Sequence, residues 1–230
     1  NTIWSNGYGI YWDYFYYIGS GLYNSSSVIL GDILLTGNSI SSDGDGFYFS
    51  EFYEIGSEME QDSTFTMGDF QINENTVKSN SSGIYFQYWY ETGYDMRDNA
   101  VFTMGDFQIN NNFIISEDEG IYTYEFYYWG YYLYNSTSAT FGDFEINNNN
   151  VTSRDDDGIY IYYLEYFGYY LYEDATFIFG SFQINNNDVW AQRTGIYIYE
   201  LYEWGYEMEG SSSFEMGDIQ IMENNVESNS

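Results

Sequence analysis

The sequence predicts an all-β fold, a parallel β-solenoid of six coils of about 37 residues each, and two observations support this prediction. The first is an eight-residue motif that recurs along the whole chain. It reads GDILLTGN at 31–38, GDFQINEN at 68–75, GDFQINNN at 105–112, GDFEINNN at 142–149, GSFQINNN at 180–187 and GDIQIMEN at 217–224, and its glycines are 37, 37, 37, 38 and 37 residues apart. The second is that the repeats, laid over one another, place like residues in columns. A period of this length is typical of architectures in which each unit buries its apolar face only by stacking on its neighbours.

Each repeat opens on a glycine, and one repeat follows another without a break. The opening glycines are Gly9, Gly46, Gly83, Gly120, Gly158 and Gly195, and residues 1–8 form a partial repeat. The single 38-residue step comes from an extra acidic residue within residues 154–157. Because this segment tolerates an insertion, we expect it to be an exposed turn. We expect residues 1–230 to form a single repeat domain.

Two kinds of strand are expected within each repeat. The segment after the opening glycine is rich in β-branched and aromatic residues, with apolar residues at positions such as Ile196, Ile198 and Leu201, which predicts a long strand with a kink. In residues 65–67 and 70–72 apolar and polar residues alternate, and the alternation shifts by one at the intervening Gly-Asp. This pattern predicts a strand, a bend and a second strand.

A column of tyrosines lies two residues after the opening glycines. Parallel in-register stacking places each residue about 4.8 Å from its counterpart in the next coil, so columns of identical residues favour this arrangement. The predicted aromatic ladder consists of Tyr11, Tyr48, Tyr85, Tyr122, Tyr160 and Tyr197.

A six-bladed β-propeller is the alternative fold, since six repeats could form six blades. Repeats of 37 residues are short for four strands with their turns, and the dipeptides typical of hairpins are scarce within them. Residues 1–8 also duplicate the repeat positions of residues 224–230, whereas a propeller usually completes its last blade with the N-terminal segment. The solenoid is therefore the preferred fold.

The last asparagine of the motif forms a second column. Stacked side-chain amides can donate hydrogen bonds from coil to coil and hold a tight corner, so this column is predicted to be a structural ladder that packs inward rather than a ligand site. It consists of Asn38, Asn75, Asn112, Asn149, Asn187 and Asn224, with Asn1 at the same repeat position.

The aspartates of the motif form a third column, which is broken once by Ser181. Carboxylates about 5 Å apart repel each other by roughly 1 kcal/mol per pair even in water, so something must screen them. Bound Ca²⁺ is one explanation, because a hard cation prefers oxygen ligands, and solvated turns screened by salt are the other. The column consists of Asp32, Asp69, Asp106, Asp143 and Asp218.

Composition excludes several classes of function. The formal charge of -32, with 36 acidic and 4 basic residues, makes nucleic acid and anionic membrane surfaces poor partners. The chain contains neither Cys nor His, so thiolate sites and the commonest general base are missing. Acidic residues are spread over all repeats without one divergent coil, so we expect no enzymatic activity and no cofactor apart from the Ca²⁺ considered above.

Two classes of function remain open. Tyrosines on both faces of the long strand, together with clusters such as residues 127–129, predict an aromatic surface. That surface would serve either as a protein contact face or as a carbohydrate-binding, adhesive one. The chain starts and stops at the same repeat position, lacks a capping segment and contains no Pro. Open terminal strands template further pairing, so we predict self-assembly by end-to-end β-stacking of copies of this chain.

The chain is expected to be extracellular. No stretch approaches the roughly 20 apolar residues that a membrane-spanning helix needs. The sequence begins at Asn1 with neither an initiator Met nor a charged and then apolar leader, which indicates a processed chain or a fragment. N-linked glycans are predicted at the Asn-X-Ser/Thr triplets that begin at Asn24, Asn80, Asn135 and Asn150.

Two resemblances follow from these features. The Asn-rich motif followed by a glycine-led strand, as in residues 195–199 (GIYIY), resembles the parallel β-helix repeats of archaeal and bacterial surface proteins. Uncapped stacking, abundant Tyr, absent Pro and Cys, and strong acidity are similar to the amyloid-like sheath proteins that encase some filamentous methanogenic archaea. The second resemblance implies a subunit of an extracellular sheath, hoop or filament, formed without disulfide cross-links.

Overall fold

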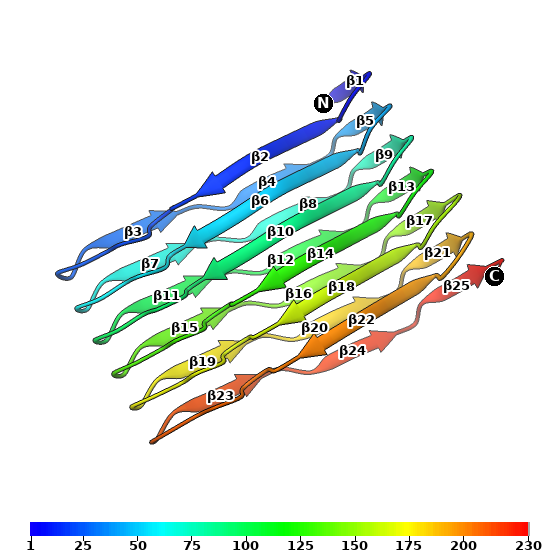
Figure 1. Ribbon diagram of the computed structural model, residues 1–230. Helices are drawn as coiled ribbons and strands as arrows, with labels where there is room; N and C mark the ends of the chain where they lie inside the picture. The colour runs from blue at the N-terminus through cyan, green and yellow to red at the C-terminus, as the bar shows by residue number, and fades with distance from the viewer. Residues whose placement is uncertain (230) are drawn as a thin grey trace.

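The computed structural model describes residues 1–229 and shows a parallel β-solenoid (Figure 1). Every strand pairs in parallel with the strand at the same place in the neighbouring coil, and no helix occurs in the described residues. The predicted solenoid is confirmed. The propeller is wrong, because strands pair between consecutive repeats rather than within one repeat.

Four sheets run along the solenoid axis. The front sheet consists of β2 (Ile10–Tyr16), β6 (Phe47–Ile55), β10 (Ile84–Thr92), β14 (Ile121–Tyr127), β18 (Ile159–Glu165) and β22 (Ile196–Tyr202). The first return sheet consists of β3 (Ser27–Leu30), β7 (Thr64–Met67), β11 (Val101–Met104), β15 (Ser138–Phe141), β19 (Thr176–Phe179) and β23 (Ser213–Met216). The second return sheet consists of β4 (Ile33–Thr36), β8 (Phe70–Asn73), β12 (Phe107–Asn110), β16 (Phe144–Asn147), β20 (Phe182–Asn185) and β24 (Ile219–Met222). The third return sheet consists of β1 (Thr2–Ser5), β5 (Ser39–Ser42), β9 (Thr76–Ser79), β13 (Phe113–Ser116), β17 (Asn150–Ser153), β21 (Asp188–Ala191) and β25 (Asn225–Ser228).

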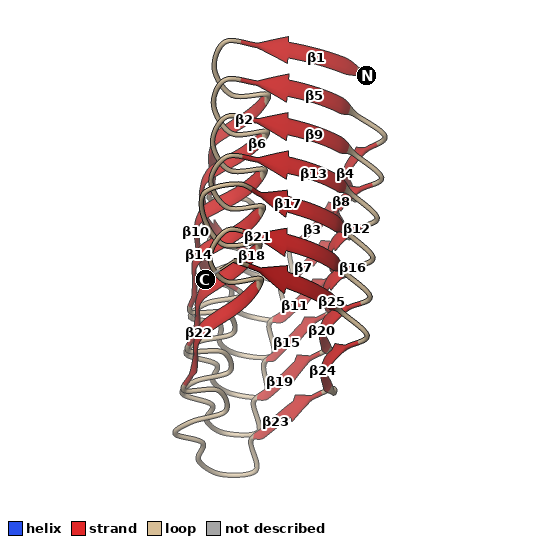
Figure 2. Ribbon diagram, turned by 90° about the vertical axis from the view of Figure 1, so that its right-hand side faces the viewer, coloured by secondary structure: helices blue, strands red, loops and turns tan. Residues whose placement is uncertain are grey.

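Each coil crosses the front sheet once and comes back through the three shorter return strands. Figure 1 shows the long strands in front with the return strands behind them, and the two chain ends lie at opposite ends of the stack. Figure 2 shows the third return sheet, β1 to β25, as an evenly spaced column along the axis. Any position in a coil therefore lies next to the same position in the coils before and after it.

The front strand ends at a kink that recurs in all six coils. At this kink one residue of each repeat adopts a left-handed backbone conformation, with φ between 53° and 61°. This conformation moves the following residue back onto the inner face, so that Ile55 is as fully buried as Phe52 three residues earlier. The kink residues are Tyr17, Glu54, Glu91, Tyr128, Tyr166 and Glu203.

The core lies between the front sheet and the return sheets. Alternate residues of each return strand point inward, as in β8, where Phe70 and Ile72 are buried and the residues between and after them are half-exposed. Aromatic rings fill the space edge to face, with 5.5 Å between the ring centroids of Phe70 and Phe49. The six coils thus share one continuous apolar core.

The turn that holds the inserted acidic residue is exposed only in part. Arg154 and Asp155 are exposed, but Asp157 is buried, and its Oδ1 accepts a hydrogen bond from the backbone N–H of Thr194 at 2.7 Å. The expectation of an exposed turn is therefore wrong for Asp157, because the next coil covers this residue.

Candidate functional site

The asparagine column forms a ladder of hydrogen bonds from Asn1 to Asn224. Nδ2 of each asparagine donates to Oδ1 of the next at 2.9 to 3.0 Å. A backbone N–H joins the same acceptor, as Asn112 N does with Asn149 Oδ1 at 2.9 Å. Nδ2 of Asn112 also donates to the carbonyl of Ile72 in the preceding coil at 2.7 Å. The middle amides are thus buried without losing hydrogen bonds, and the column holds the corner between the second and third return sheets.

A second asparagine column lies two residues earlier in the motif and was not predicted. The Oδ1 of each member accepts the backbone N–H of its counterpart in the next coil, as Asn73 does from Asn110 at 2.8 Å. Superposing the repeats would have found this column, because four of six repeats carry asparagine there. Its members are Asn73, Asn110, Asn147 and Asn185.

The aspartate column is held by backbone amides. Oδ1 of Asp69 accepts the N–H of Asp106 at 3.0 Å, and the same contact recurs from Asp32 to Ser181 at 2.7 to 3.1 Å. These hydrogen bonds hold the carboxylates against the backbone of the next coil, so the carboxylates are not fully exposed to solvent. Burial is the main cause that raises the pKa of Asp106 above its usual range. Within residues 1–229 no group of three acidic side chains is arranged to hold a metal ion, and Ca²⁺ binding stays a prediction.

The glycine before each aspartate leaves room for that carboxylate. A Cβ at Gly105 would lie 2.2 Å from Oδ1 of Asp69, and equally close contacts recur at the same position in the later coils up to Gly180. At Gly31, in the first coil, a Cβ would meet nothing within 4 Å. The glycine is therefore required wherever another coil precedes it.

The tyrosine column stacks ring on ring. Ring centroids lie 4.9 to 5.3 Å apart between successive members from Tyr11 to Tyr197, and the rings of Tyr85 and Tyr122 are within 4° of parallel. Each ring face within the column is covered by the next ring. The column thus offers edges and hydroxyl groups to solvent, whereas sugars stack on open ring faces.

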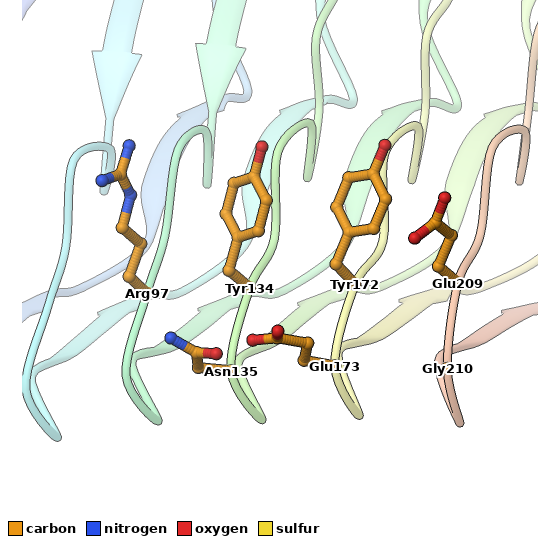
Figure 3. Close-up of a pocket in the computed structure, with 7 residues that line it drawn as sticks. All are labelled: Arg97, Tyr134, Asn135, Tyr172, Glu173, Glu209 and Gly210. Carbon is orange, nitrogen blue, oxygen red and sulfur yellow. The ribbon is translucent and has the colours of Figure 1, made fainter.

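A groove of about 760 Å³ crosses the turns between the front and first return sheets (Figure 3). One residue of each of four coils stands in a row beside it: Arg97, Tyr134, Tyr172 and Glu209. The two tyrosine rings stack at 5.3 Å between their centroids, and the Arg97 guanidinium lies 5.7 Å from the centroid of Tyr134. Here too the flat faces contact protein neighbours.

The two ends of the solenoid expose residues that middle coils bury. Ile219 and Ile221 in β24 are 56% and 48% exposed, whereas the equivalent Phe107 and Ile109 are at most 2% exposed. At the other end Ile33 and Leu35 in β4 are half-exposed, whereas the equivalent Phe70 and Ile72 are buried. The outer edges of β1 to β4 and of β22 to β25 also present backbone N–H and C=O groups along a strand edge. Such edges are templates for further strand pairing.

The predicted glycosylation sites are all accessible. Asn24, Asn80, Asn135 and Asn150 are exposed on turns or at the start of a return strand. Residues 1–229 contain no helix with the length and apolar character needed to span a bilayer.

Comparison with known proteins gives no relative: no protein-family model, curated protein or solved structure matches this chain.

Proposed function

We propose that this chain is a structural subunit that polymerises end to end, with the last coil of one copy stacking on the first coil of the next. The observation that supports the proposal is that the two end surfaces carry the same columns in the same order, so each end presents what the other end pairs with. Stacking in register would bury the apolar side chains at both ends, such as Ile221 and Leu35, in one continuous core.

The polar columns make the two ends complementary. Within the chain each asparagine donates toward the C-terminal coil, so Asn224 at the exposed end has an amide hydrogen left to donate, and Asn38 of the next copy has the side-chain oxygen that accepts this bond from Asn1 within one chain. The aspartate column runs in the opposite sense. Asp218 offers a carboxylate and Asp32 a backbone N–H. Donors would therefore meet acceptors at both columns.

The assembly would be a filament if the stacking continues, or a ring if it closes. The net charge of -32 would keep neighbouring filaments apart. An extracellular sheath or hoop would be an assembly of this type. The extracellular location is proposed from the likeness of the composition to that of sheath proteins and from the glycosylation triplets.

Gly31→Ala tests the proposal. The methyl group meets nothing within 4 Å in the isolated chain, so the fold and its thermal midpoint should be unchanged. In a polymer the Asp218 carboxylate of the preceding copy would occupy that space, as Asp69 does beside Gly105. We therefore expect filaments or rings of the unmodified chain in electron micrographs and only single subunits of the variant.

The matched control is Gly105→Ala, which should lower the thermal midpoint because its Cβ would lie 2.2 Å from Oδ1 of Asp69. An unmodified chain that sediments as a monomer at high concentration in physiological salt would refute the proposal.

A further inference from the structure

One column of the front sheet alternates between tyrosine and glutamate through all six coils. The strand register pairs Tyr14 with Glu51, Glu51 with Tyr88, Tyr88 with Glu125, Glu125 with Tyr163 and Tyr163 with Glu200. Alternation keeps carboxylates two coils apart, about 10 Å rather than 5 Å, and so reduces their repulsion. Because the column starts on Tyr14 and reaches Glu200 in the sixth coil, another copy stacked in register would continue it without a fault.

Tyrosine and glutamate of adjacent coils bind each other inside the molecule. The Tyr90 hydroxyl donates to Oε2 of Glu125, which lies two positions before its register partner Tyr127, and the Tyr53 hydroxyl donates to the carboxylate of Glu91, which lies one position after its register partner Tyr90. Hydrogen bonds to a charged acceptor are stronger than those between neutral groups. A tyrosine hydroxyl and a carboxylate of adjacent coils therefore attract each other on this sheet, across neighbouring columns, whereas two carboxylates would repel each other.

Two further columns begin with tyrosine and end with glutamate. Tyr17 shares the kink column with Glu203, and Tyr23 begins the column that continues through the row in Figure 3 to Glu209. Tyr14 and Tyr17 are each 61% exposed and Tyr23 is 47% exposed. The first coil thus presents three accessible tyrosines at the positions where the last coil presents three carboxylates.

The C-terminal coil is also more acidic than the N-terminal coil. Residues 195–230 contain eight acidic and no basic residues, whereas residues 1–36 contain two acidic residues, Asp13 and Asp32, and no basic ones. Contact between two C-terminal ends would bring the eight acidic residues of one last coil against the eight of the other, with no basic residue between them. In a head-to-tail contact only Asp218 meets an acid, Asp32, and there a backbone N–H accompanies it as in the inner coils.

We infer that the partner recognised by each end is the opposite end of a second copy of this chain, and that the pairs Glu200–Tyr14, Glu203–Tyr17 and Glu209–Tyr23 fix this head-to-tail polarity. The inference rests on the proposed function and adds the residues that select one orientation.

The test is a swap of charges across the junction. The variant Y14E/Y17E/Y23E places carboxylates opposite carboxylates, so its critical concentration for polymerisation should rise at least about 100-fold, since each charged hydrogen bond contributes about tenfold or more. The reciprocal variant Y14E/Y17E/Y23E/E200Y/E203Y/E209Y restores all three pairs with the roles reversed. It should polymerise within about tenfold of the parent chain.

A control with the same added charge separates pairing from general repulsion. T66E/F113E/N148E places three glutamates at exposed positions of inner coils, and it should polymerise like the parent chain. If Y14E/Y17E/Y23E polymerises as well as the parent, or if the sixfold swap fails to restore assembly while circular dichroism shows a native fold, the pairing is refuted although the chain still polymerises. If the parent itself stays monomeric, the proposed function fails instead.

Discussion

At the scale of single residues, the asparagine ladder decides how tightly successive coils are joined. Replacing Asn112 by Ala would remove the acceptor of two donors of Asn75 and both side-chain bonds that Asn112 donates, and all of these groups are buried. Since an unsatisfied buried polar group costs about 1 to 3 kcal/mol, we expect the free energy of unfolding to fall by about 3 to 5 kcal/mol.

The same substitution at Asn224 provides the control for this prediction. Asn224 is half-exposed and has no described coil beyond it, so water can replace part of what is lost, and the cost should be less than half of that at Asn112. Equal losses at the two positions in denaturant titrations would show that the ladder does not act through burial.

At the scale of the elements, sequence columns predicted most of what the structure shows, because in-register stacking turns identity in sequence into contact in space. The kinked long strand, the bend at Gly-Asp and the asparagine corner all follow from columns of like residues. The Tyr14–Glu200 column was missed since its residues alternate, and a search for identity passes over alternation. The hydrogen bonds that the aspartate side chains accept from backbone N–H groups were not predicted. A side chain that binds the backbone of the next coil leaves no signal in the sequence except the preceding glycine.

The front sheet also makes stability depend on pH through Glu165 in β18. Burial, and then repulsion by Glu200, Glu203 and Glu125, raises the pKa of Glu165 to about 7. The native state therefore holds a proton that the unfolded state releases near its ordinary pKa of 4.5. Stability is highest below that value, falls as the pH rises from about 4.5 to about 7, and does not fall further on this account above it.

Glu165→Gln tests this pH dependence by thermal unfolding. The variant should melt higher than the parent at about pH 8.5 and close to the parent at about pH 5. Glu74→Gln removes one charge from an exposed turn and should show no such difference between the two pH values. A gain for Glu165→Gln that is equal at both would mean that the carboxylate is not protonated in the native state.

At the scale of the whole molecule, the four sheets do not contain the same number of strands. The third return sheet has seven and each of the others has six, because β1 and β25 stand at the same repeat position. In a head-to-tail stack that places Tyr14 next to Glu200, the β1 of one copy and the β25 of the other need the same place beside β21. One of them must leave the sheet at the junction. All four residues of β25 are exposed, whereas Ile3 of β1 packs against the core, so β25 is the strand expected to yield.

Truncation of the chain tests this competition. Deleting residues 225–230 removes β25, and the partner's β1 can then pair with β21 without displacing a strand, which brings Trp4 into the same column as Trp190. We expect a shorter lag in turbidity or light-scattering measurements than for the parent chain.

Deleting residues 1–8 instead leaves β25 in place and should also shorten the lag. Deleting both segments leaves the sheet one strand short at every junction, and with each backbone hydrogen bond contributing about 1 kcal/mol the doubly truncated chain should need a higher concentration to polymerise than either single truncation. If the double deletion polymerises most readily of the three, the strands of the third return sheet do not continue across the junction, and the in-register head-to-tail stack is wrong.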